Sequence, residues 1–172
     1  VCHSQLHQMH NPGLERPLLL GHEGTGIVSD VGRDVRHVKE GDKCIVTWVP
    51  RVPLKGRAAP APTGARFQGD LAHGPVYTWS NMVLTSGSLV VPIPDEHPND
   101  LSCIVGCAVL TGAGAVLNTA QVRPGESVAV FGVGGVGLSA IKAASLLEAY
   151  PVIAVDLDDS KLEFARDFGA TH

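Results

Sequence analysis

Three short segments hold residue types that bind transition metals. Cys2 and His22 lie in the first part of the chain, and Cys107 follows Gly106 much further along. Thiolate sulfur and imidazole nitrogen are preferred ligands of zinc, which takes four ligands in a tetrahedral arrangement. A single histidine or cysteine is more often structural than metal-binding, so the three residues need a joint explanation before a metal site is inferred.

A glycine-rich segment, residues 132–137, has the spacing of a nucleotide-binding turn. The pattern G-x-G-x-x-G follows an apolar strand-like run and opens a helix-like one. The first glycine permits a tight turn, the second lets the backbone approach a pyrophosphate, and the third allows helix and strand to pack closely. The helix N-terminus adds amide N–H groups and the positive end of the helix dipole.

Asp156 strengthens this interpretation because it ends the next strand-like run, about 20 residues after the last glycine. A carboxylate at that place accepts hydrogen bonds from the ribose hydroxyls and repels a 2′-phosphate. The segment therefore predicts NAD rather than NADP. The alternatives are a glycine-rich turn that binds nothing, and a flavin or another ligand of the same fold.

Two parts of the chain, which differ in amino-acid composition, have to position these residues. Residues 1–94 are rich in glycine, proline and β-branched residues, which predicts an irregular all-β domain. Residues 51–74 are expected to form a long proline-containing loop. The expected strands are the short apolar runs 27–28, 44–46, 82–84 and 89–91.

Residues 95–172 predict a partial α/β domain. Ser160 and Glu163 are expected to form a capping box for its last helix, which ends at Gly169. Two parallel strands cannot cover their own edges and faces, so we expect a truncated doubly wound sheet. The elements before the last helix are a strand at 127–131, a helix at 136–149 and a strand at 152–156.

The other two cysteines have plainer interpretations. Cys44 lies in an apolar run and is predicted to be a core residue. Cys103 precedes Cys107 by about one helical turn, so a metal-binding pair is the alternative to the buried thiol that we favour. Four cysteines without a visible secretory signal indicate metal binding or buried thiols, and thus a reducing, cytoplasmic setting.

The composition is that of a soluble globular protein. Of its 172 residues, 44% are hydrophobic and 17% are charged. The net charge of −4, without a cluster of lysine and arginine, argues against a nucleic-acid or acidic-membrane partner. The longest apolar stretches, 101–117 and 128–141, are interrupted by glycines, so no membrane span is predicted.

Five motifs, in their order along the chain, resemble those of the zinc-dependent medium-chain alcohol dehydrogenases. Together they span nearly the whole sequence. The resemblance implies a GroES-like β-barrel domain over residues 1–94, followed by a truncated Rossmann domain over residues 95–172. The motifs are Cys-x-Ser-x-x-His at 2–7, Gly-His-Glu-Gly-x-Gly at 21–26, Gly-Asp at 41–42, Gly-Cys at 106–107 ahead of Thr-Gly at 111–112, and the turn at 132–137.

The resemblance also implies a zinc centre and its chemistry. Cys2, His22 and Cys107 match the three protein ligands of one catalytic zinc, the ligand set typical of alcohol dehydrogenases. Ser4 matches the hydroxyl residue that takes the substrate proton, and His7 matches the histidine that passes the proton to solvent. For Ser4 and His7, loop capping and solvation are the alternative roles.

Further residues match family positions around the zinc and the cofactor. Glu23 matches a carboxylate behind the zinc, and His3 matches the residue that contacts the cofactor pyrophosphate. Trp48 matches an aromatic wall of the substrate pocket, with a core position as the alternative. The complete set of predicted cofactor-binding residues is His3, Gly132, Gly134, Gly135, Val136, Gly137, Asp156 and Lys161.

Three departures from the family pattern affect these expectations. Gln5 stands where the family usually has an aspartate that orients the zinc-bound histidine; an amide can accept from the imidazole N–H but cannot stabilise charge as a carboxylate does. No cysteine lies between Trp48 and Trp79, so one catalytic zinc and no structural zinc is predicted. Strands before Cys2 and the second half of the family's sequence have no counterpart, so we expect a fragment.

The predicted function is hydride transfer from a primary or secondary alcohol to NAD, which gives an aldehyde or ketone. The alternatives are a formaldehyde or thiol-adduct dehydrogenase of the same family, and a non-catalytic nucleotide- or zinc-binding fragment. We expect a small-molecule alcohol or aldehyde as partner, no nucleic acid, no membrane, a cytoplasmic location and a homo-oligomeric parent protein.

Overall fold

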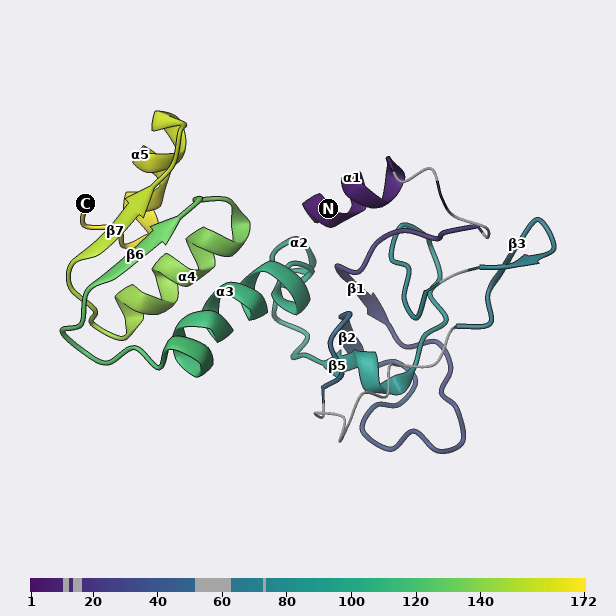
Figure 1. Ribbon diagram of the computed structural model, residues 1–172. Coiled ribbons are helices and arrows are strands. Elements are labelled where there is room, and N and C mark those ends of the chain that lie inside the picture. Colours follow the sequence, from purple (N-terminus) through teal and green to yellow (C-terminus); the bar gives the residue numbers. More distant parts are fainter. Residues whose placement is uncertain (11–12, 14–16, 52–62, 73) are drawn as a thin grey trace. The chain divides into compact units, whose positions relative to one another are not determined.

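The computed structural model describes residues 1–10, 13, 17–51, 63–72 and 74–172. The chain forms two compact units, whose elements are drawn in Figure 1. Unit 1 is Val1–Cys107 and unit 2 is Ala108–His172. The domain boundary expected between residues 94 and 95 stays a prediction.

Unit 1 contains a three-stranded antiparallel sheet. Its order is β1 (Gly24–Ile27), β2 (Lys43–Val46) and β5 (Val90–Pro92), so β2 is the central strand. In the register, Ile45 of β2 lies opposite Thr25 of β1 and Val91 of β5. Among the described residues this sheet is open, and the closed barrel expected from the family resemblance is not seen in them.

The sequence predicted the strands of unit 1 only in part. Run 44–46 falls within β2, and run 27–28 overlaps the end of β1. Run 89–91 is divided between the short helix η1 (Gly87–Leu89) and β5. The prediction for 82–84 is wrong, since these residues form no strand.

The long loop predicted at 51–74 contains a small hairpin. Strands β3 (Arg66–Phe67) and β4 (Asp70–Leu71) pair antiparallel across Gln68 and Gly69. Both turn residues have positive φ, 52° and 93°, which is the conformation that tight hairpin turns require. The rest of the predicted loop, 52–62 and 73, lies outside the described residues.

Unit 1 also begins with a helix, α1 (His3–Met9), in a segment where an all-β domain was expected. Cys2 is its N-cap, in extended conformation. The Gln5 side chain accepts a hydrogen bond from the Cys2 N–H, which is one half of a capping box. The motif residues that share this segment are therefore presented on a helix.

Residues 99–120 are helical almost throughout. They comprise α2 (Asn99–Ser102), η2 (Val105–Val109), α3 (Leu110–Gly114) and η3 (Ala115–Ala120). By length and composition this stretch could cross a membrane, with a mean hydropathy of 1.8 in its most apolar window, but core helices of soluble proteins meet the same test. The absence of a membrane span therefore stays a prediction.

Unit 2 has the parallel strand pair that the sequence predicts. Strands β6 (Val128–Phe131) and β7 (Val152–Val155) pair in parallel, with Val128 opposite Val152. Helix α4 (Gly135–Leu146) connects them, and α5 (Asp159–Phe168) follows β7. The chain is thus of the α/β class, and the complete doubly wound Rossmann sheet stays a prediction. The core consists of small and β-branched residues: Val116, Val133, Ala140, Ile141, Ala143, Ala144, Ala149, Val152 and Ala165.

The ends of α5 differ in how well the sequence predicted them. The N-cap is Asp158, whose carboxylate accepts from the Ser160 N–H, so the capping box of Ser160 and Glu163 is wrong. Asp158 is as good a cap as Ser160, and it starts the helix earlier. Gly169 is confirmed as the C-cap, with a left-handed φ of 111°.

The core of unit 2 gives a direct stability test. Ile141 is fully buried on α4, so Ile141→Ala should lower the free energy of unfolding by about 2–5 kcal/mol through lost contacts and a cavity. Leu146→Ala, in the last turn of the same helix and 73% exposed, should change it by less than about 0.5 kcal/mol. Urea titrations of both variants make the comparison, and equal effects would contradict this assignment of the core.

Candidate functional site

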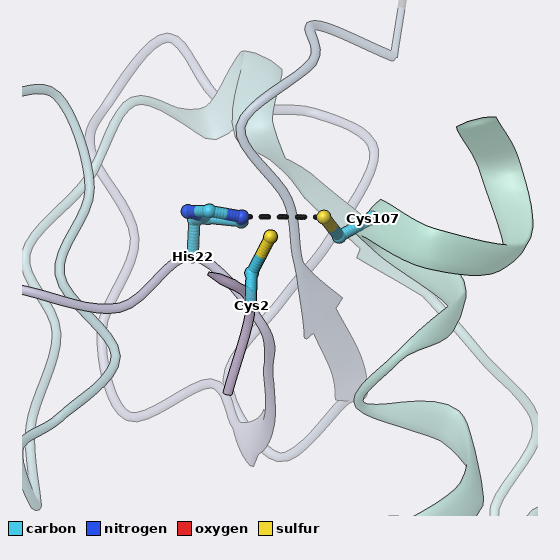
Figure 2. Close-up of side chains that lie close together, drawn as sticks. All are labelled: Cys2, His22 and Cys107. Atoms are coloured by element: carbon cyan, nitrogen blue, oxygen red, sulfur yellow. Dashed lines mark hydrogen bonds between the residues drawn. The ribbon is translucent and has the colours of Figure 1, made fainter. Parts of the chain in front are cut away.

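Three side chains from distant parts of the sequence converge in unit 1. The Sγ atoms of Cys2 and Cys107 and a ring nitrogen of His22 all lie within 4.8 Å of one another. His22 Nε2 is 3.2 Å from Cys107 Sγ, and Figure 2 shows the three side chains pointing toward one another. On a tetrahedral zinc, with Zn–S of about 2.3 Å and Zn–N of about 2.0 Å, ligand atoms lie about 3.5–3.8 Å apart. The donor set and its spacing therefore fit one zinc ion.

Cys2 is held at the start of α1 as its N-cap, in extended conformation. Burial acts to raise the pKa of the Cys2 thiol, but hydrogen bonds from Ser4 and Cys107 outweigh it and lower this pKa below its usual value. A thiol with a lowered pKa more readily gives the thiolate, which is the form that binds metal.

His22 is positioned by the close approach of two backbone segments. Gly21 has a φ of 98°, and a Cβ atom there would lie 2.5 Å from the Thr78 Oγ1. The carbonyl oxygens of Leu20 and Gly21 accept hydrogen bonds from the N–H groups of Trp79 and Thr78. Burial lowers the pKa of His22, which favours the neutral ring that a metal requires.

Cys107 is positioned by a second close approach. The buried Thr47 hydroxyl donates a hydrogen bond to the Gly106 carbonyl oxygen at 2.6 Å. A Cβ atom at Gly106 would lie 2.9 Å from the Thr47 Cβ, so a glycine before the cysteine lets the two segments meet. Burial, with the hydrogen bond to Cys2, raises the pKa of the Cys107 thiol to about 12.

The Gln5 side chain lies within hydrogen-bond distance of two of the three residues, Cys2 and His22. It is buried, its Oε1 accepts from the Cys2 N–H at 3.2 Å, and its Nε2 lies 2.6 Å from His22 Nδ1. Because the Cys2 N–H can only donate, the amide oxygen belongs on that side and the amide N–H faces Nδ1. Nδ1 then accepts, and the ring proton sits on Nε2, the nitrogen that faces Cys107.

This arrangement is the reverse of the one expected from the sequence, in which Gln5 accepts from the imidazole. A histidine that binds zinc through Nε2 carries its proton on Nδ1 and needs an acceptor there. The Gln5 amide cannot accept from both Nδ1–H and the Cys2 N–H in the present geometry, whereas a carboxylate could. Gln5 is therefore a poorer partner for a zinc-bound His22 than an acidic residue would be.

The other residues predicted around the zinc lie in unit 1 as follows. The Glu23 side chain is 7% exposed, and its Oε2 lies 3.0 Å from the Val1 amino nitrogen. The Trp48 ring is half exposed and makes an edge contact with the His22 ring, with centroids 6.3 Å apart. His3 and His7 are exposed on α1, and their rings are also in edge contact.

The predicted nucleotide turn lies in unit 2, between β6 and α4. Gly132 has a φ of 89°, and a Cβ atom at Gly137 would lie 2.0 Å from the Gly132 carbonyl oxygen. The two glycines thus allow the tight turn and the close helix–strand packing that the pattern indicates. Nothing lies within 4 Å of a Cβ at Gly134, so this part of the turn is open.

Asp156 follows β7, and its carboxylate accepts a hydrogen bond from the backbone of this turn. Its Oδ2 accepts from the Val133 N–H at 2.8 Å, and its Oδ1 lies 3.5 Å from the Lys161 Nζ. The hydrogen bond from Val133, followed by others from the backbone and the charge of Lys161, lowers the pKa of the Asp156 carboxyl. The carboxylate is therefore ionised at neutral pH, as hydrogen bonding to ribose hydroxyls requires.

Sequence reasoning missed the two threonines that position the metal-binding residues. Thr47 and Thr78 lie far from Cys107 and His22 in sequence, and single threonines carry no motif. Thr78 Oγ1 also donates to the Glu23 carbonyl oxygen and accepts from the Glu23 N–H. The available signal was the glycine before each ligand, Gly21 and Gly106, because such glycines often mark close approach of another segment.

Comparison with known proteins gives consistent relatives. A family model described as "Alcohol dehydrogenase GroES-like domain" matches residues 1–95. The S-(hydroxymethyl)glutathione dehydrogenase of Komagataella pastoris is 33% identical over 99% of this chain and 52% of its own length. The class-3 alcohol dehydrogenase of Cereibacter sphaeroides is 34% identical over 100% of this chain and 52% of its own length.

Solved structures agree with these relatives. The chain is similar to an alcohol dehydrogenase zinc-binding domain protein from Burkholderia ambifaria, with a TM-score of 0.85 and 32% identity over 100% of this chain and 53% of that one. It is also similar to the benzyl alcohol dehydrogenase of Acinetobacter calcoaceticus, with a TM-score of 0.78 and 30% identity over 100% and 52% of the two chains. The chain spans about half the length of these relatives. It belongs to the zinc-dependent medium-chain alcohol dehydrogenase family.

Proposed function

We propose that this chain is part of an NAD-dependent zinc enzyme that oxidises a primary or secondary alcohol to an aldehyde or ketone. In this reaction the alcohol loses its hydroxyl proton, and a hydride moves from its carbon to the nicotinamide, which gives NADH. The observation that carries the proposal is the convergence of Cys2, His22 and Cys107 on one point. Three such ligands leave one tetrahedral position for water or substrate.

The metal centre is proposed to hold one zinc through these three side chains. When bound, zinc supplies a Lewis acid that makes the alcohol proton easier to remove. Ser4 is proposed to accept that proton and His7 to pass it to solvent, since an imidazole ring can both accept and donate a proton. Glu23 is proposed to modulate the ligand field from behind.

The cofactor is proposed to bind at the glycine turn in unit 2. The open backbone at Gly134, followed by Gly135 and Val136 at the start of α4, suits a pyrophosphate. Asp156 is proposed to accept from the ribose hydroxyls, with Lys161 beside it. His3 is proposed as a further contact of the pyrophosphate.

The substrate can be narrowed to two classes. The half-exposed Trp48, next to His22, is proposed as a pocket wall that restricts bulky alcohols. The second candidate is a formaldehyde–thiol adduct, which is favoured by the names of several curated relatives, such as the S-(hydroxymethyl)glutathione dehydrogenases of Aspergillus oryzae and Saccharomyces cerevisiae. Activity measured with simple alcohols and with S-(hydroxymethyl)glutathione separates the two.

Location and assembly follow from the same proposal. We infer a cytoplasmic enzyme, a homo-oligomeric parent protein, and no nucleic-acid or membrane partner. The free cysteines of the described residues, Cys2, Cys44, Cys103 and Cys107, are consistent with a reducing compartment.

The complete protein should reduce NAD when an alcohol is added, and Cys2→Ala should lower this turnover more than about 100-fold because a zinc ligand is lost. NAD binding, measured by fluorescence titration, should persist, since the nucleotide turn lies in another unit. Cys44→Ala is the matched control, a buried cysteine on β2 that should keep both properties. Full turnover in Cys2→Ala would exclude Cys2 as a ligand of a catalytic zinc, whereas no turnover in the unmutated complete protein would favour a non-catalytic nucleotide- or zinc-binding protein.

Metal analysis after gel filtration should give one tightly held zinc per chain. The segment between Trp48 and Trp79, where many family members bind a structural zinc, has no cysteine to hold a second ion. His22→Ala should reduce the zinc content well below one. Two tightly held zinc ions per chain in the unmutated protein would show that the predicted stoichiometry of one zinc is wrong.

Gln5→Glu should increase zinc affinity by about 10–100-fold, because a carboxylate can accept from both the Cys2 N–H and the His22 Nδ1–H. Gln5→Asp should act in the same direction. Gln8→Glu makes the same charge change on the exposed surface of α1 and should leave zinc affinity unchanged. Competition with a chromophoric chelator measures all of these variants. An unchanged affinity in Gln5→Glu, or an equal gain in Gln8→Glu, would exclude the acceptor role.

A further inference from the structure

Helix α1 carries a pair of exposed histidines on one face. His3 and His7 are four residues apart, which places their side chains one above the other on a helix. Their ring centroids lie 5.1 Å apart, with the ring planes inclined at 66°. Neither residue belongs to the group of Cys2, His22 and Cys107.

This geometry suits a chelate. A metal–nitrogen bond of about 2.0–2.1 Å puts each imidazole centroid about 3.2 Å from the ion, so two rings on neighbouring tetrahedral or octahedral positions have centroids about 4.5–5.2 Å apart. Two histidines at positions i and i+4 of a helix also form the first part of zinc sites in metalloproteases. The observed separation of 5.1 Å lies within this range.

We propose that His3 and His7 form a second, exchangeable metal site that takes a borderline divalent cation such as Zn²⁺, Ni²⁺ or Cu²⁺. Imidazole nitrogen suits these metals, with Cu²⁺ bound most strongly and Mg²⁺ and Ca²⁺ not selected. Both rings are exposed, so water completes the coordination and the ion exchanges readily. This site therefore has a lower metal affinity than the group of Cys2, His22 and Cys107, and gel filtration removes its metal ion.

The metal site itself stands apart from the proposed function, because it needs only the two imidazole rings. One consequence does rest on that function. A cation on His7 occupies a ring that is proposed to pass the substrate proton, so excess metal should inhibit turnover. A titration measures metal binding alone, so its result can be interpreted even if the proposed function is wrong.

The experiment is a calorimetric titration of Ni²⁺ into the zinc-loaded complete protein. His3→Ala should weaken nickel binding by about tenfold or more, because the second nitrogen no longer binds intramolecularly. The double variant His7→Gln/Gln8→His keeps the composition but breaks the four-residue spacing, and it should weaken binding equally. His10→Ala is the matched control, since His10 lies at the end of the same helix with its Nδ1 engaged 2.7 Å from the Leu6 carbonyl oxygen. It should bind nickel as the unmutated protein does.

Other outcomes would overturn the proposal. Undiminished nickel binding in the spacing variant would show that the pair is not a chelate. Loss of binding in His10→Ala would move the site to His7 and His10. Nickel binding that is lost in Cys2→Ala but kept in the spacing variant would place the ion on the zinc ligands instead.

Discussion

The centre of unit 1 depends on an electrostatic conflict between two sulfur atoms. The Cys2 and Cys107 sulfurs lie within 4.8 Å of each other, the charge of the largely buried Glu23 acts on both thiols, and their pKa values are shifted in opposite directions. The pKa of the Cys2 thiol lies below its usual value, and that of the Cys107 thiol lies above it. Two thiolates beside a carboxylate repel one another, and a divalent cation between the sulfurs would offset this repulsion. The folded chain therefore presents a place whose electrostatics favour a metal.

Backbone contacts, rather than the ligands themselves, hold this place together. The segments that carry His22 and Cys107 meet other parts of unit 1 at Gly21 and Gly106, where a larger residue would collide with Thr78 or Thr47. Each threonine hydroxyl then binds a main-chain carbonyl oxygen. His22 and Cys107 are thus positioned by contacts between segments that are distant in sequence, as a preorganised metal site would require.

The sequence predicted what local chemistry determines. The glycine turn, the strand pair β6 and β7 and the cap at Gly169 can be read from short patterns, because each depends on neighbouring residues. Long-range packing could not be read in this way. Helix α1 was missed because its apolar periodicity is weak, and the orientation of the Gln5 amide was missed because it depends on the Cys2 N–H and the distant His22 at once. The strand expected at 82–84 failed for the same reason, since β-branched and apolar residues form a strand only where a partner strand is available.

The hydrogen bond from the Val133 N–H to the Asp156 carboxylate has a consequence for how a dinucleotide would bind. The proposed nucleotide loop is tied to the end of β7 by this hydrogen bond, so little conformational entropy would be lost on binding. The same carboxylate is proposed to recognise the ribose. One side chain would then both order the loop and select the cofactor. A change of preference toward a 2′-phosphorylated cofactor would require a replacement for the Asp156–Val133 hydrogen bond as well as for the carboxylate that accepts from the ribose.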